Sequence, residues 1–88
     1  MSDDPGLNQL RAQIGEQDRT ILEAVNRRVE LVAQIKAYKD ANGIDFVDPG
    51  REAQLLDDLA TANRGPLSEQ GLRELFETVL ALTKRELA

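Results

Sequence analysis

The sequence predicts an all-α protein with three helices, one very long, one short and one of medium length. Two observations carry this prediction. Apolar residues recur at helical spacing through most of the chain, and the prolines and glycines that interrupt it fall at only a few positions. The composition agrees, because 41% of the 88 residues are hydrophobic and only 3% are aromatic, which suits an aliphatic helical core.

The first predicted helix covers residues 7–42, a stretch without proline. Its apolar positions are Leu7, Leu10, Ile14, Ile21, Val25, Val29, Val32 and Ile35. Such a helix is about 54 Å long, and its length far exceeds the average of about 11–12 residues. Because a chain of 88 residues cannot cover it alone, the helix must bend back, break or pack along a second chain.

Capping residues define the second predicted helix. Gly43 suits a left-handed cap at the end of the first helix, and residues 44–47 form a short extended link. Asp48 is typical of an N-cap, with Pro49 at the first helical position, and the helix ends near Asn63.

The third predicted helix follows a turn at residues 65–66. Ser68 is a good N-cap for a helix from Glu69 to about Leu87. Its apolar residues, which we expect to be buried, are Leu72, Leu75, Phe76, Val79, Leu80 and Leu82.

We expect residues 1–88 to form a single helical domain, with residues 1–6 as a flexible N-terminus. A core of this size is marginal, and a chain without cysteine has no disulfides, so oligomerisation is the remaining support. The lack of cysteine and histidine also excludes thiolate and imidazole metal sites and the usual nucleophilic triads. We expect no metal site.

The charge of the chain limits its partners. Sixteen acidic and 11 basic residues give a net charge of −5, which argues against nucleic acid and anionic membranes. No signal peptide is visible, and no apolar run approaches the ~20 residues that a membrane span needs. We therefore expect a cytoplasmic protein.

Three long cations lie on the apolar side of the first helix. With Ile14 at the centre of the stripe and steps of about 100° per residue, Arg28 falls near −40°, Lys39 near −20° and Arg11 near +60°. A buried cation is costly unless it is paired. One interpretation is structural, with the side chains reaching the edge of the stripe or pairing with acids of another helix.

The other interpretation is an anion site. Arg28 and Lys39 are about 16 Å apart along the helix, so their side chains can lean toward one small molecule. Arg11 lies about 25 Å from Arg28, and it reaches the same site only from an antiparallel helix of a second chain. Cations in an apolar cleft suit a small dicarboxylate, which arginine binds bidentately.

The other two helices add charged and polar candidates. Glu52 in the first turn of the second helix complements the helix dipole, whereas Arg51 opposes it and needs another explanation. In the third helix, Thr83 supplies a hydroxyl within a charged C-terminal stretch, residues 83–86.

The order and spacing of these residues resemble the AroQ-type chorismate mutases over residues 7–87. The matching positions are Leu10, Arg11, Ile14 and Asp18; Arg27, Arg28, Glu30 and Leu31; Ile35 and Lys39; Asp48, Arg51 and Glu52; and residues 65–68. The resemblance implies an intertwined homodimeric helical bundle with two identical active sites. It also implies an isomerase of the shikimate pathway that converts chorismate to prephenate for phenylalanine and tyrosine biosynthesis, without a covalent intermediate or a cofactor.

The resemblance also implies roles for the cations. Arg28 and the partner chain's Arg11 would hold the two substrate carboxylates. Lys39 would donate a hydrogen bond to the ether oxygen of the breaking bond and to a carboxylate. A pericyclic rearrangement needs only a compact substrate conformer and donors where negative charge develops.

The remaining roles fall on the second and third helices. Glu52 and the backbone of Asp48 would receive the ring hydroxyl, and Arg51 would support the carboxylate side. Thr83 stands where the family usually has serine. The apolar wall would consist of Ile35, Leu55 and Leu80.

The sequence departs from the family near its end. One turn after Thr83 the family has a glutamine or glutamate that faces the ether oxygen, whereas this chain has Leu87. Glu86 would substitute only if it were protonated and the helix end shifted. Lys84 stands where the family often has an apolar wall residue. Reduced activity, a frayed C-terminus and dependence on an activating partner enzyme are the three explanations.

Two alternatives stay open. An isochorismate–pyruvate lyase resembles this family and uses similar cations. A non-catalytic helical dimerisation or regulatory module explains the long helix and the acidic surface, but it leaves Arg28 and Lys39 on the apolar face unexplained.

Overall fold

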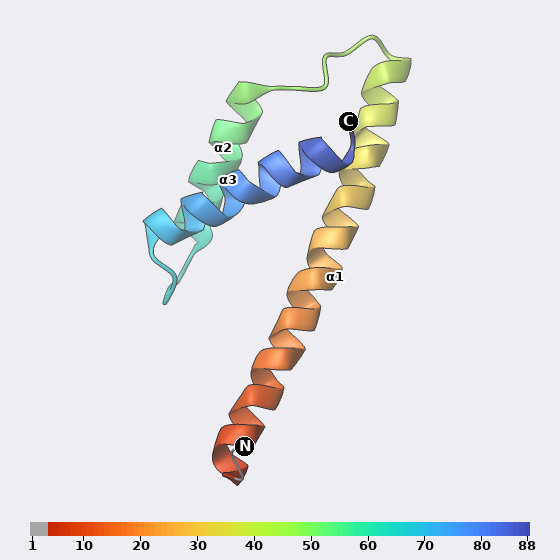
Figure 1. The fold of residues 1–88 in the computed structure, drawn as a ribbon. Helices are drawn as coiled ribbons and strands as arrows, with labels where there is room; N and C mark the ends of the chain where they lie inside the picture. The colour runs from red at the N-terminus through yellow and green to blue at the C-terminus, as the bar shows by residue number, and fades with distance from the viewer. Residues whose placement is uncertain (1–3) are drawn as a thin grey trace.

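The structure, a computed structural model, describes residues 4–88. This part of the chain forms three helices and no strand: α1 (Pro5–Ala41), α2 (Pro49–Ala62) and α3 (Glu69–Glu86) (Figure 1). The predicted all-α class and the order of a very long, a short and a medium helix are confirmed. None of these helices combines the length and apolar character that a membrane crossing requires.

Helix α1 begins two residues earlier than the apolar periodicity predicts. The Asp4 carboxylate accepts a hydrogen bond from the Leu7 backbone N–H at 3.0 Å, so Pro5 becomes the first helical residue. The N-terminus that we expected to be flexible over residues 1–6 is therefore helical at Pro5 and Gly6. Its first three residues lie outside the described part of the chain.

The predicted caps set the other helix boundaries. Gly43 adopts a φ of 66°, and the Ile44 N–H donates to the Lys39 carbonyl at 2.8 Å, which is the long bond of a Schellman motif. The side chains of Asp48 and Ser68 accept backbone N–H bonds at 3.1 and 3.0 Å and so begin α2 and α3.

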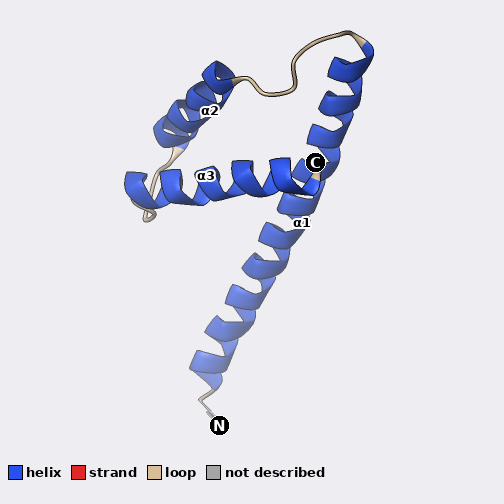
Figure 2. Cartoon of the chain, turned by 45° about the horizontal axis from the view of Figure 1, so that its top comes forward, coloured by secondary structure: helices blue, strands red, loops and turns tan. Residues whose placement is uncertain are grey.

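Helix α3 is the central packing element, because it contacts both α1 and α2. In two views, α3 runs from the end of α2 to the C-terminal half of α1, and the N-terminal half of α1 extends away from both (Figures 1 and 2). The chain is consequently elongated, with extents of 58 × 24 × 17 Å. Its radius of gyration is 17.1 Å, whereas a compact domain of this length has about 12 Å.

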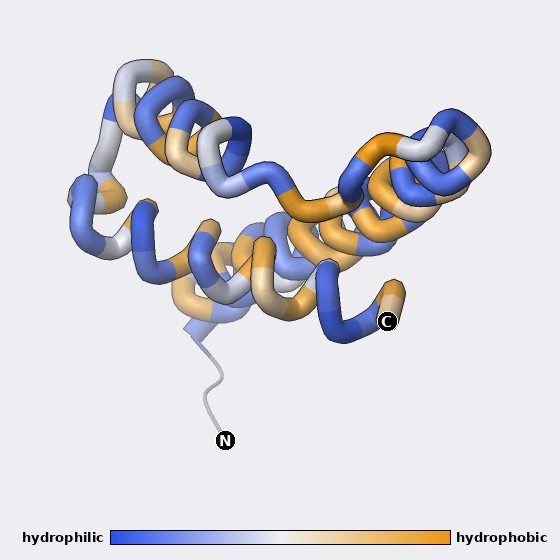
Figure 3. Tube along the Cα trace, turned by 90° about the horizontal axis from the view of Figure 1, so that it is seen from above, coloured by the Kyte–Doolittle hydropathy of each residue, from blue (hydrophilic) through white to orange (hydrophobic). Residues whose placement is uncertain are grey.

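The protomer buries little of its apolar surface. Among the described residues, only Leu72 and Thr83 are buried, each 4% exposed. Leu75, which we expected to be buried, is 48% exposed, because α1 and α2 cover only part of the apolar face of α3. The accessible surface is 6997 Å², compared with about 5,200 Å² for a folded monomer of this mass. Hydrophobic and hydrophilic residues alternate along the helices, so each has an apolar face (Figure 3).

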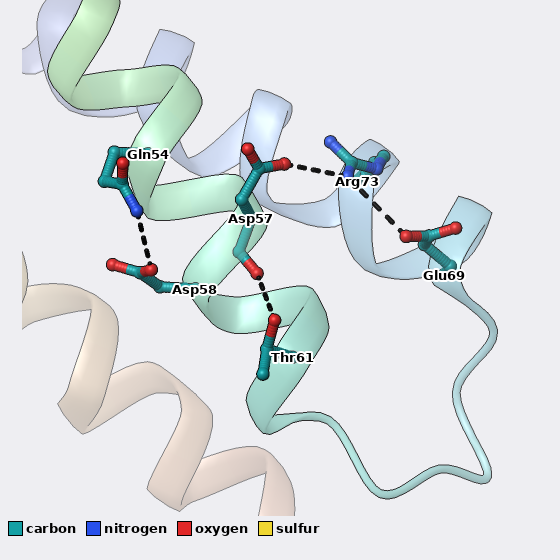
Figure 4. Close-up of polar contacts among 6 residues, drawn as sticks. All are labelled: Gln54, Asp57, Asp58, Thr61, Glu69 and Arg73. Atoms are coloured by element: carbon teal, nitrogen blue, oxygen red, sulfur yellow. Dashed lines mark hydrogen bonds and ion pairs between the residues drawn. The ribbon is translucent and has the colours of Figure 1, made fainter.

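Exposed polar contacts join α2 to α3. The Arg73 guanidinium of α3 lies 3.2 Å from the Asp57 carboxylate of α2 and 3.6 Å from Glu69 (Figure 4). The hydrogen bond with Asp57 is the main cause that raises the pKa of Arg73 above its ordinary value, so this cation stays charged. Within α2, Thr61 donates to the Asp57 carbonyl at 3.1 Å. Of these contacts, the one between Arg73 and Asp57 crosses from α3 to α2 and helps to hold the two helices together.

Candidate active site

A cavity of about 450 Å³ lies where all three helices approach one another. This volume falls within the range of about 300–1,000 Å³ that small-molecule sites occupy. Residues of α1, the following link, α2 and α3 line it in turn: Arg28, Val32, Ile35 and Lys39; Phe46, Val47 and Asp48; Arg51, Glu52 and Leu55; Leu80 and Lys84. The cavity therefore combines aliphatic walls with six charged side chains.

Arg28 is held from behind by Thr83. The Arg28 Nη1 donates to the Thr83 hydroxyl at 2.8 Å, and that hydroxyl donates to the Val79 carbonyl at 2.7 Å. Because Thr83 is buried, this small chain of hydrogen bonds limits the positions available to the guanidinium. The other N–H groups of Arg28 remain as donors at the cavity, in the planar arrangement that matches a carboxylate.

Lys39 lies in the last turn of α1 and is anchored by the link that follows. Its Nζ donates to the Phe46 carbonyl at 3.3 Å. An ammonium has three N–H donors, so two remain for another partner. The turn at Gly43 allows this contact, because it redirects the chain so that Phe46 lies near Lys39 at the end of α1.

The acidic groups of the cavity have different tasks. The Asp48 carboxylate caps α2 by accepting the Arg51 N–H at 3.1 Å. Glu52, one turn later, forms an ion pair with Lys84 of α3, in which Nζ and Oε1 are 2.6 Å apart. This pair connects α2 with α3 at the cavity, where the side chain of Glu52 is 29% exposed and that of Lys84 is 40% exposed.

The balance of charge in the cavity is opposite to that of the chain. Four cations and two carboxylates line it, for a formal charge of +2, whereas the whole chain carries −5. The lining therefore suits a compact molecule with two negative charges, because such a ligand neutralises the excess of cations around the cavity.

The structure gathers most of the residues that sequence reasoning selected. Eight of them line the cavity: Arg28, Ile35, Lys39, Asp48, Arg51, Glu52, Leu55 and Leu80. Thr83 is not among the lining residues, but its hydroxyl accepts a hydrogen bond from Arg28, which is. Arg11 lies on the exposed N-terminal half of α1, and Glu86 and Leu87 end α3 outside the lining.

Sequence reasoning missed three lining residues, Val32, Phe46 and Val47, and it noted Lys84 at a wall position of the family without including it in the site. Lys84 had a usable signal, because it follows Leu80 by four residues and so shares its helical face. Phe46 contributes its backbone carbonyl to Lys39, and no side-chain pattern predicts a contact of that kind.

Fold and cavity together define a class: an all-α protein with a cation-rich cavity between its three helices. The family model of chorismate mutase type II matches residues 10–86, nearly the whole chain. The chain belongs to this family, and the resemblance inferred from the sequence is confirmed.

Individual relatives agree with the family. The chain is 33% identical over 82 residues to a 4-amino-4-deoxychorismate mutase of Streptomyces venezuelae, covering 91% of this chain and 79% of that protein. It is 30% identical to a bifunctional chorismate mutase/prephenate dehydratase of Stutzerimonas stutzeri, covering 92% of this chain and 24% of that longer protein.

Solved structures show the same arrangement of helices. A chorismate mutase of Thermus thermophilus, in its form II, superimposes with a TM-score of 0.86 at 28% identity and covers 90% of each chain. Form I of the same enzyme gives a TM-score of 0.85 at 28% identity, with 88% of this chain and 96% of that chain covered.

Proposed function

We propose that this protein is a chorismate mutase that converts chorismate to prephenate in the cavity between α1, α2 and α3. The observation that carries the proposal is the lining of that cavity, with Arg28 and Lys39 held by hydrogen bonds at one side and aliphatic walls around them. In this rearrangement the ether C–O bond breaks as a C–C bond forms, and no atom enters or leaves. Family membership supports the same activity.

The cavity has the two things that this reaction needs. The first is confinement, because a shaped apolar space with fixed cations holds the substrate in the compact conformer that reacts. The second is a donor aimed at the ether oxygen, on which negative charge develops in the transition state. Lys39 supplies this donor, since only one of its three N–H groups is used by Phe46. Arg28 holds a substrate carboxylate.

Glu52 receives the ring hydroxyl in this proposal. Glu52 shares Oε1 with Lys84 and lines the cavity, so a substrate hydroxyl can reach its carboxylate, and the backbone of Asp48 lies at the same end of the cavity. Arg51 supports a carboxylate from the first turn of α2. Because Glu86 and Leu87 do not line the cavity, Lys39 is its main donor to the ether oxygen unless an activating partner enzyme reshapes the end of α3.

A chorismate-disappearance assay on the purified protein, with prephenate identified as product, tests this function. Isochorismate is the matched second substrate, because a lyase would release pyruvate and salicylate from it. Consumption of chorismate with formation of prephenate is the expected result. Absence of turnover on both substrates would support a non-catalytic module instead.

Thr83 gives a prediction within the proposed site. Thr83→Val keeps the shape of the side chain and removes the hydroxyl that accepts from Arg28, so we expect kcat/KM for chorismate to fall about tenfold. Thr83→Ser keeps the acceptor and should retain activity within about threefold. Steady-state kinetics on both variants measure this, and equal activity of the two would show that the Arg28 contact is dispensable.

We also propose that the working unit is a homodimer. Large apolar residues stay exposed along the part of α1 that α2 and α3 leave uncovered: Leu7, Leu10, Ile14, Ile21 and Leu22. An indentation of about 590 Å³ covers residues 10–17 of this stretch, but a single helix lines it, so it suits a packing partner better than an enclosed ligand. An antiparallel second copy would cover the stripe and bring Arg11 of the partner to the cavity.

A charge inserted into this stripe tests the dimer. Ile21→Arg places a cation at a position that is 60% exposed in the protomer and that the dimer would bury. We expect a monomer of half the mass by sedimentation velocity, with loss of turnover. Glu23→Arg, on the opposite face of α1, is the control and should remain dimeric. A wild-type protein that sediments as a monomer would contradict the proposal.

A further inference from the structure

Lys84 lines the cavity but has no part in the rearrangement as proposed. Its ammonium lies 2.6 Å from Glu52 Oε1, and it reaches the cavity from α3, whereas Glu52 reaches it from α2. Both side chains line the cavity, so the pair also faces whatever fills it. Lys84 is therefore placed to change how Glu52 interacts with a ligand.

Glu52 is the carboxylate of this cavity that a hydrogen-bond donor of the substrate can use. Asp48 accepts the Arg51 N–H to cap α2, whereas the ion-pair partner of Glu52 is a flexible lysine. Without Lys84, the carboxylate would attract a positively charged group as strongly as a neutral donor, or more so. With Lys84 in place, the negative charge of the Glu52 carboxylate is already balanced at close range.

We propose that Lys84 makes the site selective for a hydroxyl, against an ammonium, at the ring position that meets Glu52. The proposal rests on the proposed function. The proposal distinguishes two substrates. Chorismate has a hydroxyl at ring carbon 4, and 4-amino-4-deoxychorismate has an amine there instead. The relative from Streptomyces venezuelae is named as a mutase of the second compound.

The two substituents differ in charge and in hydrogen bonding. A hydroxyl donates one hydrogen bond and accepts others, so it can donate to Glu52 while accepting from Lys84. An amine is protonated near neutral pH, has no lone pair left to accept, and places a second cation beside Lys84. It also reduces the charge of the substrate from −2 to −1, which matches a cavity of formal charge +2 less well.

Kinetics with both compounds on the 88-residue chain test the proposal. We expect the wild type to favour chorismate by about tenfold or more in kcat/KM, and Lys84→Met to reduce this preference about tenfold through better use of the amine. Lys84→Arg keeps the charge and should keep the preference. Lys36→Met is a matched control, because Lys36 is also 40% exposed and pairs with an acid, Asp40, outside the cavity lining.

A double variant separates charge from shape. Adding Glu52→Gln to Lys84→Met removes the carboxylate that would attract the ammonium, so the gained use of the amine should be lost again. Lys84→Gln replaces Lys84→Met if the methionine variant does not show the wild-type helical circular dichroism signal. The ratio of the two substrates is the decisive readout, because a purely structural role of the ion pair would lower both rates together.

The outcomes distinguish the failure of this selectivity proposal from the failure of the proposed mutase function. Turnover of chorismate with an unchanged ratio in Lys84→Met, or a wild type that prefers the amine, overturns the selectivity proposal and leaves the mutase activity standing. A wild type that rearranges neither compound overturns the proposed function, and the role of Lys84 with it.

Discussion

Arg28→Met is expected to lower kcat/KM for chorismate about 10³-fold while the protein stays folded. The guanidinium is held by Thr83 at 2.8 Å and turns its remaining donors to the cavity, so its removal deletes a preorganised, charge-assisted contact with a carboxylate. Methionine fills much of the same volume without charge. Arg28→Lys should recover only part of the activity, because an ammonium cannot reproduce the bidentate arrangement.

Arg27 provides the control for this experiment. It is the preceding residue of the same helix, its side chain is 61% exposed, and it pairs with Glu30 at 3.2 Å. Arg27→Met should keep kcat/KM within about twofold, as a surface substitution usually does. Circular dichroism and sedimentation on both variants establish that they are folded. Full activity of folded Arg28→Met would remove the case for catalysis in this cavity.

Lys39→Met is expected to reduce kcat about 10³-fold with a smaller change in KM. The ammonium is anchored to the Phe46 carbonyl at 3.3 Å and has two further donors. A group that contacts the ether oxygen acts mainly in the transition state, where that oxygen becomes negative, so its loss appears in kcat more than in KM. Saturation kinetics on chorismate separate the two constants.

Lys36→Met, three residues earlier on α1, is the matched control and should behave as the wild type. The alternative for Lys39 has its own signature. An increase in KM with an unchanged kcat would mean that this lysine binds a substrate carboxylate in the ground state alone, and that another group serves the ether oxygen.

The helices could be predicted because their signals are local. Asp48 with Pro49 begins α2, Ser68 begins α3, and Gly43 at φ 66° follows the end of α1, each as its type and position predict. The start of α1 differed, because the apolar pattern begins at Leu7 whereas the cap formed by Asp4 lies before it. Asp4 and Pro5 carry the same cap signal as Asp48 and Pro49, so the sequence contains this start although the apolar periodicity does not.

Two residues of the cavity could also be predicted from local sequence. Arg28 and Lys39 are on one helix, so helical geometry alone placed both on its apolar side. Both residues line the cavity in the structure. The exposure of Leu75 was not predictable in the same way, because an apolar face predicts that something covers it and does not say whether the same chain does so.

The three helices, the caps of α2 and α3 and the cationic stripe of α1 follow from the local sequence, since each depends on residues within about one or two turns. The groups that surround those cations depend instead on how the helices pack. Thr83 meets Arg28 across 55 positions of sequence, and Lys84 meets Glu52 because α3 packs against α2. Such contacts depend on how helices pack and on which rotamers the packing leaves open, and neither is present in the spacing of residues along one helix.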